Sequence, residues 1–461
     1  MKEVYLKSAG EIARITGGRL TAGSENQKIS VISSDSRDLG SGALFIPLVG
    51  ERFDGHNFLA DLISEKKIAA ALTSVEGFEE AAKKQGVTLI RCDDTLAALG
   101  RIGAAHRASL NTEIIGITGT NGKTTTKELL HTVLSGSFSA FKNEKNYNNE
   151  IGVPFSLLAL SRLHEKGVVE MGMNHPGEIE RLSRIVKPDL SLITNVGEGH
   201  LEFLGSLEGV AAAKSEILAG MKPGALLLVN GETLCFDLVA RAAEEAGMKL
   251  KTYGAGEGFD YSPESYRLSR EGIELQWKGS DFSVPLYGVH NVYNIMAVIA
   301  AASEMGLTSD EIKKSLAGVN NVDGRSQIME MGYIVVNDTY NSNPLSSRFA
   351  LRSVSEIFPE RRKFAVLADM KELGETAPQC HRDIGREAAD LNFDFLLVWG
   401  EMGKEYLEGA AGGSDALTAL HFDTKQELIA SLQSELVDGD VVLVKGSRST
   451  RMEEVVKALE K

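Results

Sequence analysis

Cysteine is scarce in this chain, and its spacing excludes a disulfide framework. The 461 residues include three cysteines, Cys92, Cys235 and Cys380, an odd number spread widely over the sequence. None of them forms the C-x-x-C spacing that is typical of zinc sites. We therefore expect small buried thiols in a protein of a reducing compartment.

An excess of positive charge is also lacking. The chain has 49 Lys and Arg residues against 64 Asp and Glu, which leaves a net charge of −15. A general nucleic-acid binder neutralises phosphates with surplus Lys and Arg, so we expect no nucleic-acid partner. Net charge says nothing about single pockets, however, and an acidic protein can still hold a phosphate in one basic site.

Long apolar runs are absent as well. The first eighteen residues, MKEVYLKSAGEIARITGG, contain no apolar segment followed by a small-residue cleavage site, as a secretory signal would. No apolar run approaches the roughly 18 to 20 residues that span a bilayer. We expect a cytoplasmic protein without membrane insertion.

Short apolar runs alternate with helical patterns through most of the chain. The runs include residues 114–117, 190–193, 226–229, 364–367 and 441–444. Each is apolar on both faces, as buried parallel strands are. This alternation predicts an α/β architecture with parallel sheets. Between residues 261 and 287, alternating apolar and polar residues predict a β-hairpin appended to the middle of the chain.

The length and two discontinuities predict three domains. A chain of 461 residues corresponds to about three units of roughly 150 residues each. The first hundred residues lack a long strand–helix series, and a polar, turn-rich stretch at 317–324 precedes a new strand. We expect a small N-terminal α/β domain over residues 1–109, a central P-loop-type mononucleotide-binding α/β domain over 110–322, and a C-terminal Rossmann-like α/β domain over 323–461.

The most informative motif is a glycine-rich loop, GITGTNGKTTT, at residues 116–126, between an apolar strand and a helix. Glycines let backbone N–H groups surround phosphate oxygens, and the helix N-terminus adds partial positive charge. We expect Lys123 to reach the β- and γ-phosphates of a nucleotide and the Thr124 hydroxyl to ligate Mg²⁺. The standard spacing places glycine at position 117, where this chain has isoleucine, so the loop is a variant. The predicted nucleotide-binding residues of the loop are Gly119, Thr120, Asn121, Gly122, Lys123, Thr124 and Thr125.

Three further polar residues occupy positions where functional side chains could lie. Glu170 directly follows an apolar strand, at the end where ligands collect in open α/β sheets. His200 follows the strand at 190–194, and Lys214 lies on an alanine-rich helix. An isolated glutamate is usually a solvated surface charge, a lone histidine is usually structural, and such a lysine is usually exposed. The residue types alone leave these alternatives open.

Taken together, the segments resemble the Mur ligase family, ATP-dependent amide-bond ligases of peptidoglycan assembly. The family's motifs occur in order over nearly the whole chain, at residues 119–125, 146–154, 170–179, 195–202, 290–294, 338–344, 369–374 and 445–448. The Asn-Tyr-Asn-Asn, Asn-His-Pro-Gly and Tyr-Asn-x-Asn-Pro segments are those of the family member that adds a dipeptide.

The resemblance implies an activity and its cofactors. The expected reaction is the ADP-forming ligation of D-Ala-D-Ala to UDP-MurNAc-tripeptide through an acyl phosphate, with ATP and Mg²⁺. The first domain would bind the UDP substrate, the central domain ATP, and the third domain the dipeptide, in a monomer. A sibling Mur ligase or a folylpolyglutamate-type ligase with another amino-acid substrate is the alternative. A GTPase-like switch is disfavoured because no guanine-selecting N-K-x-D segment occurs.

The resemblance also implies roles for individual residues. Thr124 and Glu170 would ligate one Mg²⁺ and His200 a second, while Lys214, converted to a carbamate by CO₂, would offer anionic oxygens to the metal. The expected catalytic set consists of Lys123, Glu170, His200, Lys214 and Arg325. Adenine, ribose and phosphate contacts fall to Asn291, Asn294, Arg325, Asp338 and Tyr340. Substrate contacts fall to Ser36, Arg37, Phe45, Asp54, His56, Asn146, Asn148, Asn149, Asn341, Asn343, Lys445 and Arg448.

Overall fold

Helices and strands alternate along the chain in the computed structural model, which describes residues 3–40, 42–50, 52–144, 146–319, 323–412 and 417–460. They form three α/β units, each built on its own sheet, so the predicted fold class is confirmed. None of the helices in these ranges is long and apolar enough to cross a membrane. The predicted boundary between the second and third domains involves residues 320–322, which lie outside the described ranges.

The first domain is a mixed sheet with helices on its faces. Its strands lie in the order β1-β3-β4-β7-β8-β2, with β1 and β2 antiparallel to their neighbours at the two edges. Its elements are β1 (Glu3–Ser8), α1 (Ala9–Thr16), β2 (Arg19–Ala22), β3 (Lys28–Ser33), β4 (Ala43–Phe45), β5 (Val49–Gly50), β6 (Phe53–Asp54), η1 (Gly55–Phe58), α2 (Leu59–Ser64), β7 (Ala70–Thr73), α3 (Glu79–Gln85), β8 (Thr88–Arg91) and α4 (Thr95–Ala108).

The central domain contains a fully parallel sheet in the order β10-β11-β9-β12-β13-β14. Because β9 lies in the middle, its carboxyl end is flanked by the ends of β11 and β12. The elements are β9 (Glu113–Thr118), α5 (Lys123–Ser135), β10 (Ala140–Lys142), α6 (Gly152–Leu157), β11 (Lys166–Glu170), α7 (Glu178–Val186), β12 (Leu190–Ile193), α8 (Leu201–Leu204), α9 (Leu207–Ser215), η2 (Glu216–Gly220), β13 (Leu226–Asn230), α10 (Phe236–Glu245), β14 (Lys249–Tyr253), α11 (His290–Glu304) and α12 (Ser309–Leu316).

The hairpin predicted over residues 261–287 is confirmed, and a third strand extends it. Strands β15 (Ser265–Ser269), β16 (Gly272–Trp277) and β17 (Ser280–Val284) form an antiparallel sheet that contacts α12. The second turn has positive φ at both Lys278 and Gly279, the conformation that matches the twist of a tight hairpin.

The third domain repeats the parallel pattern with one antiparallel edge strand. Its order is β18-β19-β23-β20-β21-β22, with β18 antiparallel to β19. The elements are β18 (Gln327–Glu330), β19 (Ile334–Asp338), α13 (Pro344–Ile357), β20 (Lys363–Ala368), η3 (Gly374–Thr376), α14 (Ala377–Asp390), β21 (Phe395–Trp399), α15 (Gly403–Ala410), β22 (Thr418–Phe422), α16 (Lys425–Glu435), β23 (Val441–Lys445), η4 (Arg448–Thr450) and α17 (Glu453–Leu459).

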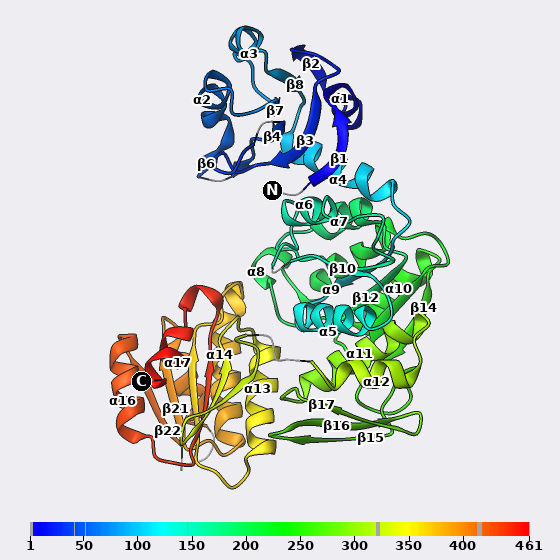
Figure 1. Cartoon of the computed structure of the whole chain (residues 1–461). Helices are drawn as coiled ribbons and strands as arrows, with labels where there is room; N and C mark the ends of the chain where they lie inside the picture. The colour runs from blue at the N-terminus through cyan, green and yellow to red at the C-terminus, as the bar shows by residue number, and fades with distance from the viewer. Residues whose placement is uncertain are drawn as a thin grey trace.

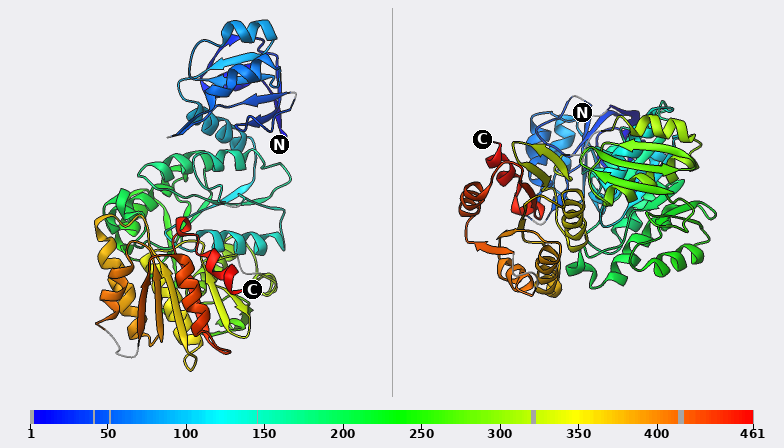
Figure 2. Two further views of the ribbon diagram at one scale, coloured as in Figure 1. Left: turned by 90° about the vertical axis from the view of Figure 1, so that its left-hand side faces the viewer. Right: turned by 90° about the horizontal axis from the view of Figure 1, so that it is seen from below.

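The first and third domains contact different sides of the central domain (Figure 1). The first domain forms a separate lobe, joined through α4, which packs against α6 and α7 (Figure 2). Buried Arg107 near the end of α4 fixes this junction: it donates hydrogen bonds to the carbonyls of Leu110 and Val186, and its guanidinium lies 3.2 Å from the Asp189 carboxylate.

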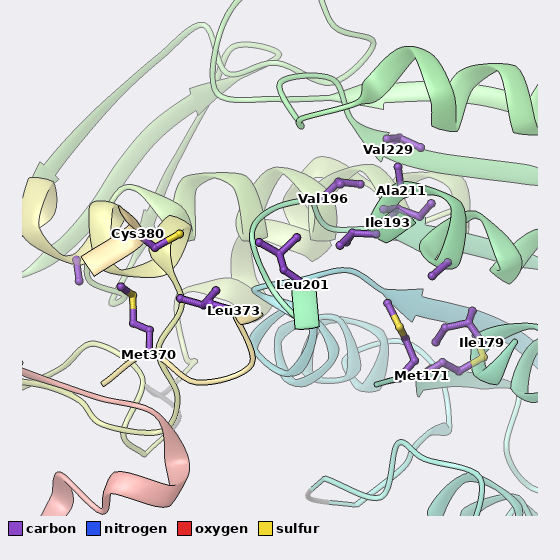
Figure 3. Packing of buried hydrophobic residues seen from close by; sticks show 14 of the residues in the cluster. Met171, Ile179, Ile193, Val196, Leu201, Ala211, Val229, Met370, Leu373 and Cys380 are labelled. Atoms are coloured by element: carbon purple, nitrogen blue, oxygen red, sulfur yellow. The ribbon is translucent and has the colours of Figure 1, made fainter. Parts of the chain in front are cut away.

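Apolar packing continues from the central domain into the third. One buried cluster contains central-domain residues such as Ile193 and third-domain residues such as Met370 and Leu373. Figure 3 shows Leu201 of α8 beside Leu373, at the junction of the two domains. Burying a leucine side chain contributes roughly 1.5–3 kcal/mol, so this contact stabilises the packing of the third domain against the central domain.

We predict that Arg107→Ala lowers the free energy of unfolding by about 2–4 kcal/mol, because buried carbonyls and the Asp189 carboxylate lose their donor. The measurement is the urea unfolding midpoint followed by circular dichroism. Arg184→Ala is the control, since Arg184 forms a surface ion pair with Glu180 on α7, and its effect should stay within about 0.5 kcal/mol. Equal shifts in the two variants would contradict the role given to Arg107.

Candidate active site

The phosphate loop leaves the carboxyl end of β9 and enters α5 through two glycines with positive φ. Gly119 has φ +146°, and a Cβ atom there would lie 1.9 Å from Thr194 Oγ1. Gly122 has φ +79°, and its Cβ would lie 2.4 Å from Asn294 Oδ1. Both positions therefore require glycine for space as well as for conformation.

The segment that directly follows β12 holds the loop through hydrogen bonds. The Asn121 carbonyl accepts hydrogen bonds from Thr194 Oγ1 (2.6 Å) and Asn195 Nδ2 (3.1 Å), while the Asn121 N–H donates to Asn195 Oδ1 (2.9 Å). The Thr120 hydroxyl accepts from the Gly197 N–H at 3.1 Å. Asn121 is also joined to the third domain through a reciprocal pair of amide hydrogen bonds with Asn343, of 3.1 and 2.8 Å.

Lys123 directs its ammonium group back over the loop. Its Nζ donates to the carbonyls of Gly119 (2.7 Å) and Thr120 (3.1 Å). Burial lowers the pKa of Lys123, Glu170 opposes this change, and the Arg325 guanidinium adds to it. Burial and the charge of Arg325 both disfavour the protonated form of Lys123. An additional anion bound beside the ammonium would therefore stabilise its charged form.

The Thr124 hydroxyl joins the central and third domains. It donates to Glu170 Oε1 at 3.2 Å and accepts from Arg325 Nη2 at 3.1 Å. The guanidinium of Arg325 also lies 4.0 Å from the ring centroid of Tyr340. The structure thus brings together three residues that the sequence placed in one site although they are far apart along the chain.

Glu170 is buried in a polar frame that includes two residues missing from the predicted set. Its Oε1 accepts from Asn148 Nδ2 at 2.8 Å, and Asn143 bonds the Glu170 backbone at both its N–H and its carbonyl. Lys127 is fully buried, with Nζ 3.5 Å from Glu170 Oε2. The sequence contained one clue to the burial of Lys127. This lysine follows Lys123 by four residues and lies on the apolar face of α5 that also carries Leu130.

His200 and Lys214 have very different surroundings. His200 Nδ1 lies 2.7 Å from Glu372 Oε2 of the third domain. This contact is the largest cause that lowers the pKa of Glu372. Lys214 is fully buried, and its Nζ has no hydrogen-bond partner among the described residues. Burial, followed by the charge of Lys123, lowers the pKa of Lys214 well below its usual range.

A cavity of about 320 Å³ lies beside the loop between the two domains. Asn294, His290, Tyr293, Asp338, Tyr340 and Arg325 are among the residues that line it. Burial lowers the pKa of His290 to about 4, so its ring is neutral at neutral pH. Asn291 supports the wall rather than lining it: its amide donates to the Tyr287 carbonyl and accepts from Asn294.

A larger cleft of about 1560 Å³ opens on the other side of Lys123. It is lined by Thr124, His200, Glu372, Asn146, Asn341 and Arg448, among others. Lys445 is buried at the end of β23, where its Nζ bonds Asp338 Oδ2 (2.5 Å) and the Asn341 carbonyl (2.9 Å). Asn149 accepts from the Gly152 N–H at 2.8 Å, so its side chain organises the start of α6.

The predicted residues of the first domain lie in the separate lobe. The His56 N–H donates to Asp54 Oδ1 at 2.9 Å, and the Ser74 N–H donates to His56 Nε2 at 3.2 Å. That bond to Nε2 places the ring proton on Nδ1, which lies 2.7 Å from Asp54. Arg37 is exposed and bonded to Asp35, and Ser36 is half-buried beside it. Phe45 is 1% exposed within the domain core, so its side chain supports the fold of this lobe.

Comparison with known families finds Mur ligase domains along the chain. The models described as "Mur ligase family, catalytic domain", "Mur ligase middle domain" and "Mur ligase, glutamate ligase domain" match residues 28–165, 117–302 and 324–448.

Relatives match over almost the full length. The chain is 36% identical over 440 residues to the UDP-N-acetylmuramoyl-tripeptide–D-alanyl-D-alanine ligase of Bacillus subtilis, covering 94% of each chain. A crystal structure of MurF from Acinetobacter baumannii superposes with a TM-score of 0.89 at 31% identity and covers 100% of both chains. A MurF ligase from Thermotoga maritima in complex with ADP gives a TM-score of 0.81 at 27% identity, covering 93% of this chain and 96% of the other.

We predict that Gly119→Ala weakens ADP binding at least about tenfold, or ~1.4 kcal/mol, because its Cβ has no room against Thr194. Isothermal titration calorimetry with ADP measures this loss. Gly412→Ala is the control, since its Cβ would meet no atom closer than 3.6 Å. ADP affinity in Gly119→Ala equal to that of the parent would overturn the assignment of the loop.

Proposed function

The chain belongs to the Mur ligase family, and from that premise we propose that it joins D-Ala-D-Ala to UDP-MurNAc-tripeptide at the expense of ATP, producing UDP-MurNAc-pentapeptide for peptidoglycan synthesis. The observation that carries this proposal is the meeting of Thr124, Glu170 and Arg325 at the carboxyl end of β9. This arrangement gives a phosphate-binding loop a carboxylate from its own domain and a cation from the next. The identity to the Bacillus subtilis ligase over 94% of both chains supports the choice of substrates.

The residues present fit ATP and Mg²⁺. The loop turns with positive φ at Gly119 and Gly122 and leads directly into the N-terminus of α5, whose backbone N–H groups suit a phosphate. Glu170 Oε2 is buried and forms no hydrogen bond with the described residues, although the Lys127 ammonium lies 3.5 Å away, and Thr124 supplies a hydroxyl beside the carboxylate. Hard oxygen donors of this kind suit Mg²⁺. The bound metal would neutralise phosphate charge and orient the γ-phosphate.

The reaction needs no nucleophile from the enzyme. The tripeptide carboxylate attacks the γ-phosphate and ADP leaves; the amine of D-Ala-D-Ala then attacks the acyl phosphate, phosphate leaves, and the amine proton passes to solvent. We assign to Lys123 and Arg325 the neutralisation of charge on the transferring phosphoryl group. Because Arg325 comes from the third domain, closure of that domain completes the site and limits the access of water to the acyl phosphate.

The two other substrates approach from opposite sides. Ser36, Arg37, Asp54 and His56 are our candidates for the UDP group in the first lobe, with Asn146 in the cleft toward the peptide. Asn341 and Arg448 line the cleft on the third-domain side, where we place the dipeptide. The ammonium of Lys445 is engaged with Asp338 and Asn341, so we assign it the support of that wall.

We further propose that Lys214 is carbamylated. A buried ammonium without a hydrogen-bond partner is costly, and Lys123 adds a like charge nearby. The neutral amine forms a C–N bond to CO₂ and loses one proton, which converts the side chain to an anion. The anion would balance Lys123 and offer oxygens to a divalent cation.

We propose that the enzyme works as a monomer in the cytoplasm, where ATP and UDP-linked precursors are found. Its cysteines are free thiols, in keeping with a reducing compartment. Sedimentation equilibrium that gave a multiple of the single-chain mass would overturn the monomer.

We predict phosphate release only when UDP-MurNAc-tripeptide, ATP and D-Ala-D-Ala are all present, because each phosphate released requires the amine to attack the acyl phosphate. A coupled phosphate assay that omits each substrate in turn measures this dependence. In Lys123→Ala, kcat should fall by at least about 10²-fold, since one preorganised cation is lost.

The same assay separates the alternatives. Turnover with diaminopimelate, D-Glu or L-Glu in place of D-Ala-D-Ala would point to a sibling Mur ligase or a folylpolyglutamate-type ligase and would reject our choice. Phosphate release by Lys123→Ala at the parent rate would reject the role of the loop.

We predict a carbamate resonance in ¹³C NMR spectra of the enzyme equilibrated with ¹³C-bicarbonate, and its loss in Lys214→Met, because the signal needs the buried amine. Lys222→Met removes an exposed lysine nearby in the chain and should keep the resonance. A carbamate signal that persists in Lys214→Met would refute the assignment.

A further inference from the structure

We propose that Glu372 of the third domain is a positioning residue for His200, so that domain closure itself completes the second divalent-cation site. This inference rests on the proposed function, because it concerns how the residue assigned to the second Mg²⁺ is oriented. It assigns a task to Glu372, which did not belong to the set of site residues predicted from sequence.

The geometry of the pair carries the proposal. His200 Nδ1 lies 2.7 Å from Glu372 Oε2, across the boundary between the two domains. The contact is an ion pair, and Nδ1 forms no hydrogen bond with the described residues. Both residues have left-handed backbone conformations, with φ +58° at His200 and φ +64° at Glu372. Such conformations are uncommon outside glycine and concentrate at functional sites. Two of them facing each other indicate that this contact is held by the surrounding fold.

The loop that carries Glu372 is fixed on the third-domain side. The Met370 N–H donates to Nε2 of buried His381 at 2.9 Å, and the Lys371 N–H donates to Ser447 Oγ at 2.9 Å. The Lys371 ammonium pairs with Asp369 (2.9 Å). These bonds set the direction of the loop as a part of the third domain.

The same loop docks beside His200 on α8. The Glu202 N–H donates to the Glu372 carbonyl at 3.2 Å. Leu201 and Leu373, the residues that directly follow His200 and Glu372, lie side by side in the apolar cluster shared by the two domains (Figure 3). Gly374 approaches Glu202 so closely that its Cβ would lie 3.3 Å from the Glu202 Cα. A backbone hydrogen bond, an apolar contact and an ion pair therefore act jointly to place Glu372 beside His200.

A carboxylate at Nδ1 determines what the other ring nitrogen does. A carboxylate 2.7 Å from Nδ1 favours the tautomer with the proton on that nitrogen, so Nε2 retains the lone pair that a metal ligand needs. The carboxylate also makes the imidazole a better electron donor. Since Glu372 belongs to the third domain, the carboxylate is beside His200 only while that domain packs against the central domain. The second cation would then bind most tightly when the third domain is packed against the central domain.

The pair does little for stability, which makes it testable. The side chains are 22% and 44% exposed, and ion pairs at such sites contribute little to folding. Glu372→Gln should therefore keep the fold while it replaces the carboxylate by a weaker acceptor. Glu375→Gln removes the same charge from an exposed position of the same loop and is the matched control.

Two readouts on the full-length enzyme test the proposal. We expect Glu372→Gln to raise the Mg²⁺ concentration for half-maximal phosphate release by about 10- to 100-fold, the usual effect of losing a partner behind a metal-ligating histidine. Mn²⁺ binding, followed by electron paramagnetic resonance with a non-hydrolysable ATP analogue and UDP-MurNAc-tripeptide, should lose affinity at one site by a similar factor. Glu375→Gln should match the parent in both measurements. Parent-like Mg²⁺ dependence and Mn²⁺ binding in Glu372→Gln would overturn the proposal.

A double variant tests whether Glu372 acts through His200. Once His200 is replaced by alanine, adding Glu372→Gln should change Mn²⁺ binding no further, because the residue being oriented is gone. Additive losses would overturn the proposal. Failure of the proposed function is distinguishable, since the parent enzyme itself would then show no phosphate release with the three substrates.

Discussion

The hydroxyl of Thr124 accepts a hydrogen bond from Arg325 of the third domain while it donates one to Glu170 of the central domain, and the rest of the active site depends on that meeting point. Thr124 is in place because Gly119 and Gly122 let the chain turn sharply from β9 into α5. The turn lies at the middle of the sheet, because β9 has β11 on one side and β12 on the other. A backbone constraint of a few residues thus sets where phosphate chemistry can occur.

Closure of the third domain is built from several kinds of contact, each of which would be weak alone. Asn121 and Asn343 exchange amide hydrogen bonds, and Leu373 continues the apolar core of the central domain. His200 and Glu372, which directly precede Leu201 and Leu373 in the chain, form an ion pair across the same boundary. Because the same surfaces that dock the domain also place Arg325 and Glu372, assembly and catalysis are coupled by geometry. The first lobe is anchored on another side of the central domain, by α4 and Arg107. In that position it can hold the nucleotide end of a long substrate.

Much of the fold and part of the site could be predicted from local patterns. Short apolar runs marked the parallel strands, because burial on both faces demands apolar residues in sequence. The loop from Gly119 to Thr125 was recognisable because its chemistry is local. Lys127 and Asn143 were missed, since a lysine on an apolar helix face and an asparagine in a loop show their purpose only beside Glu170. Phe45 and Asn291 were chosen as contact residues, yet the first fills a core and the second supports a wall.

The α/β architecture, the phosphate loop and the family could be predicted before the fold was known, because these depend on short-range patterns of apolar residues, glycines and motif order. Packing of the folded chain brings distant residues together: Arg325 meets Thr124, Lys445 meets Asp338, and Glu372 meets His200. It also decided that Lys214, on a helix typical of the surface, is buried with no hydrogen-bond partner among the described residues. Such facts follow from how sheets and domains pack, since burial and ion pairing are properties of three-dimensional neighbours and not of neighbours along the chain.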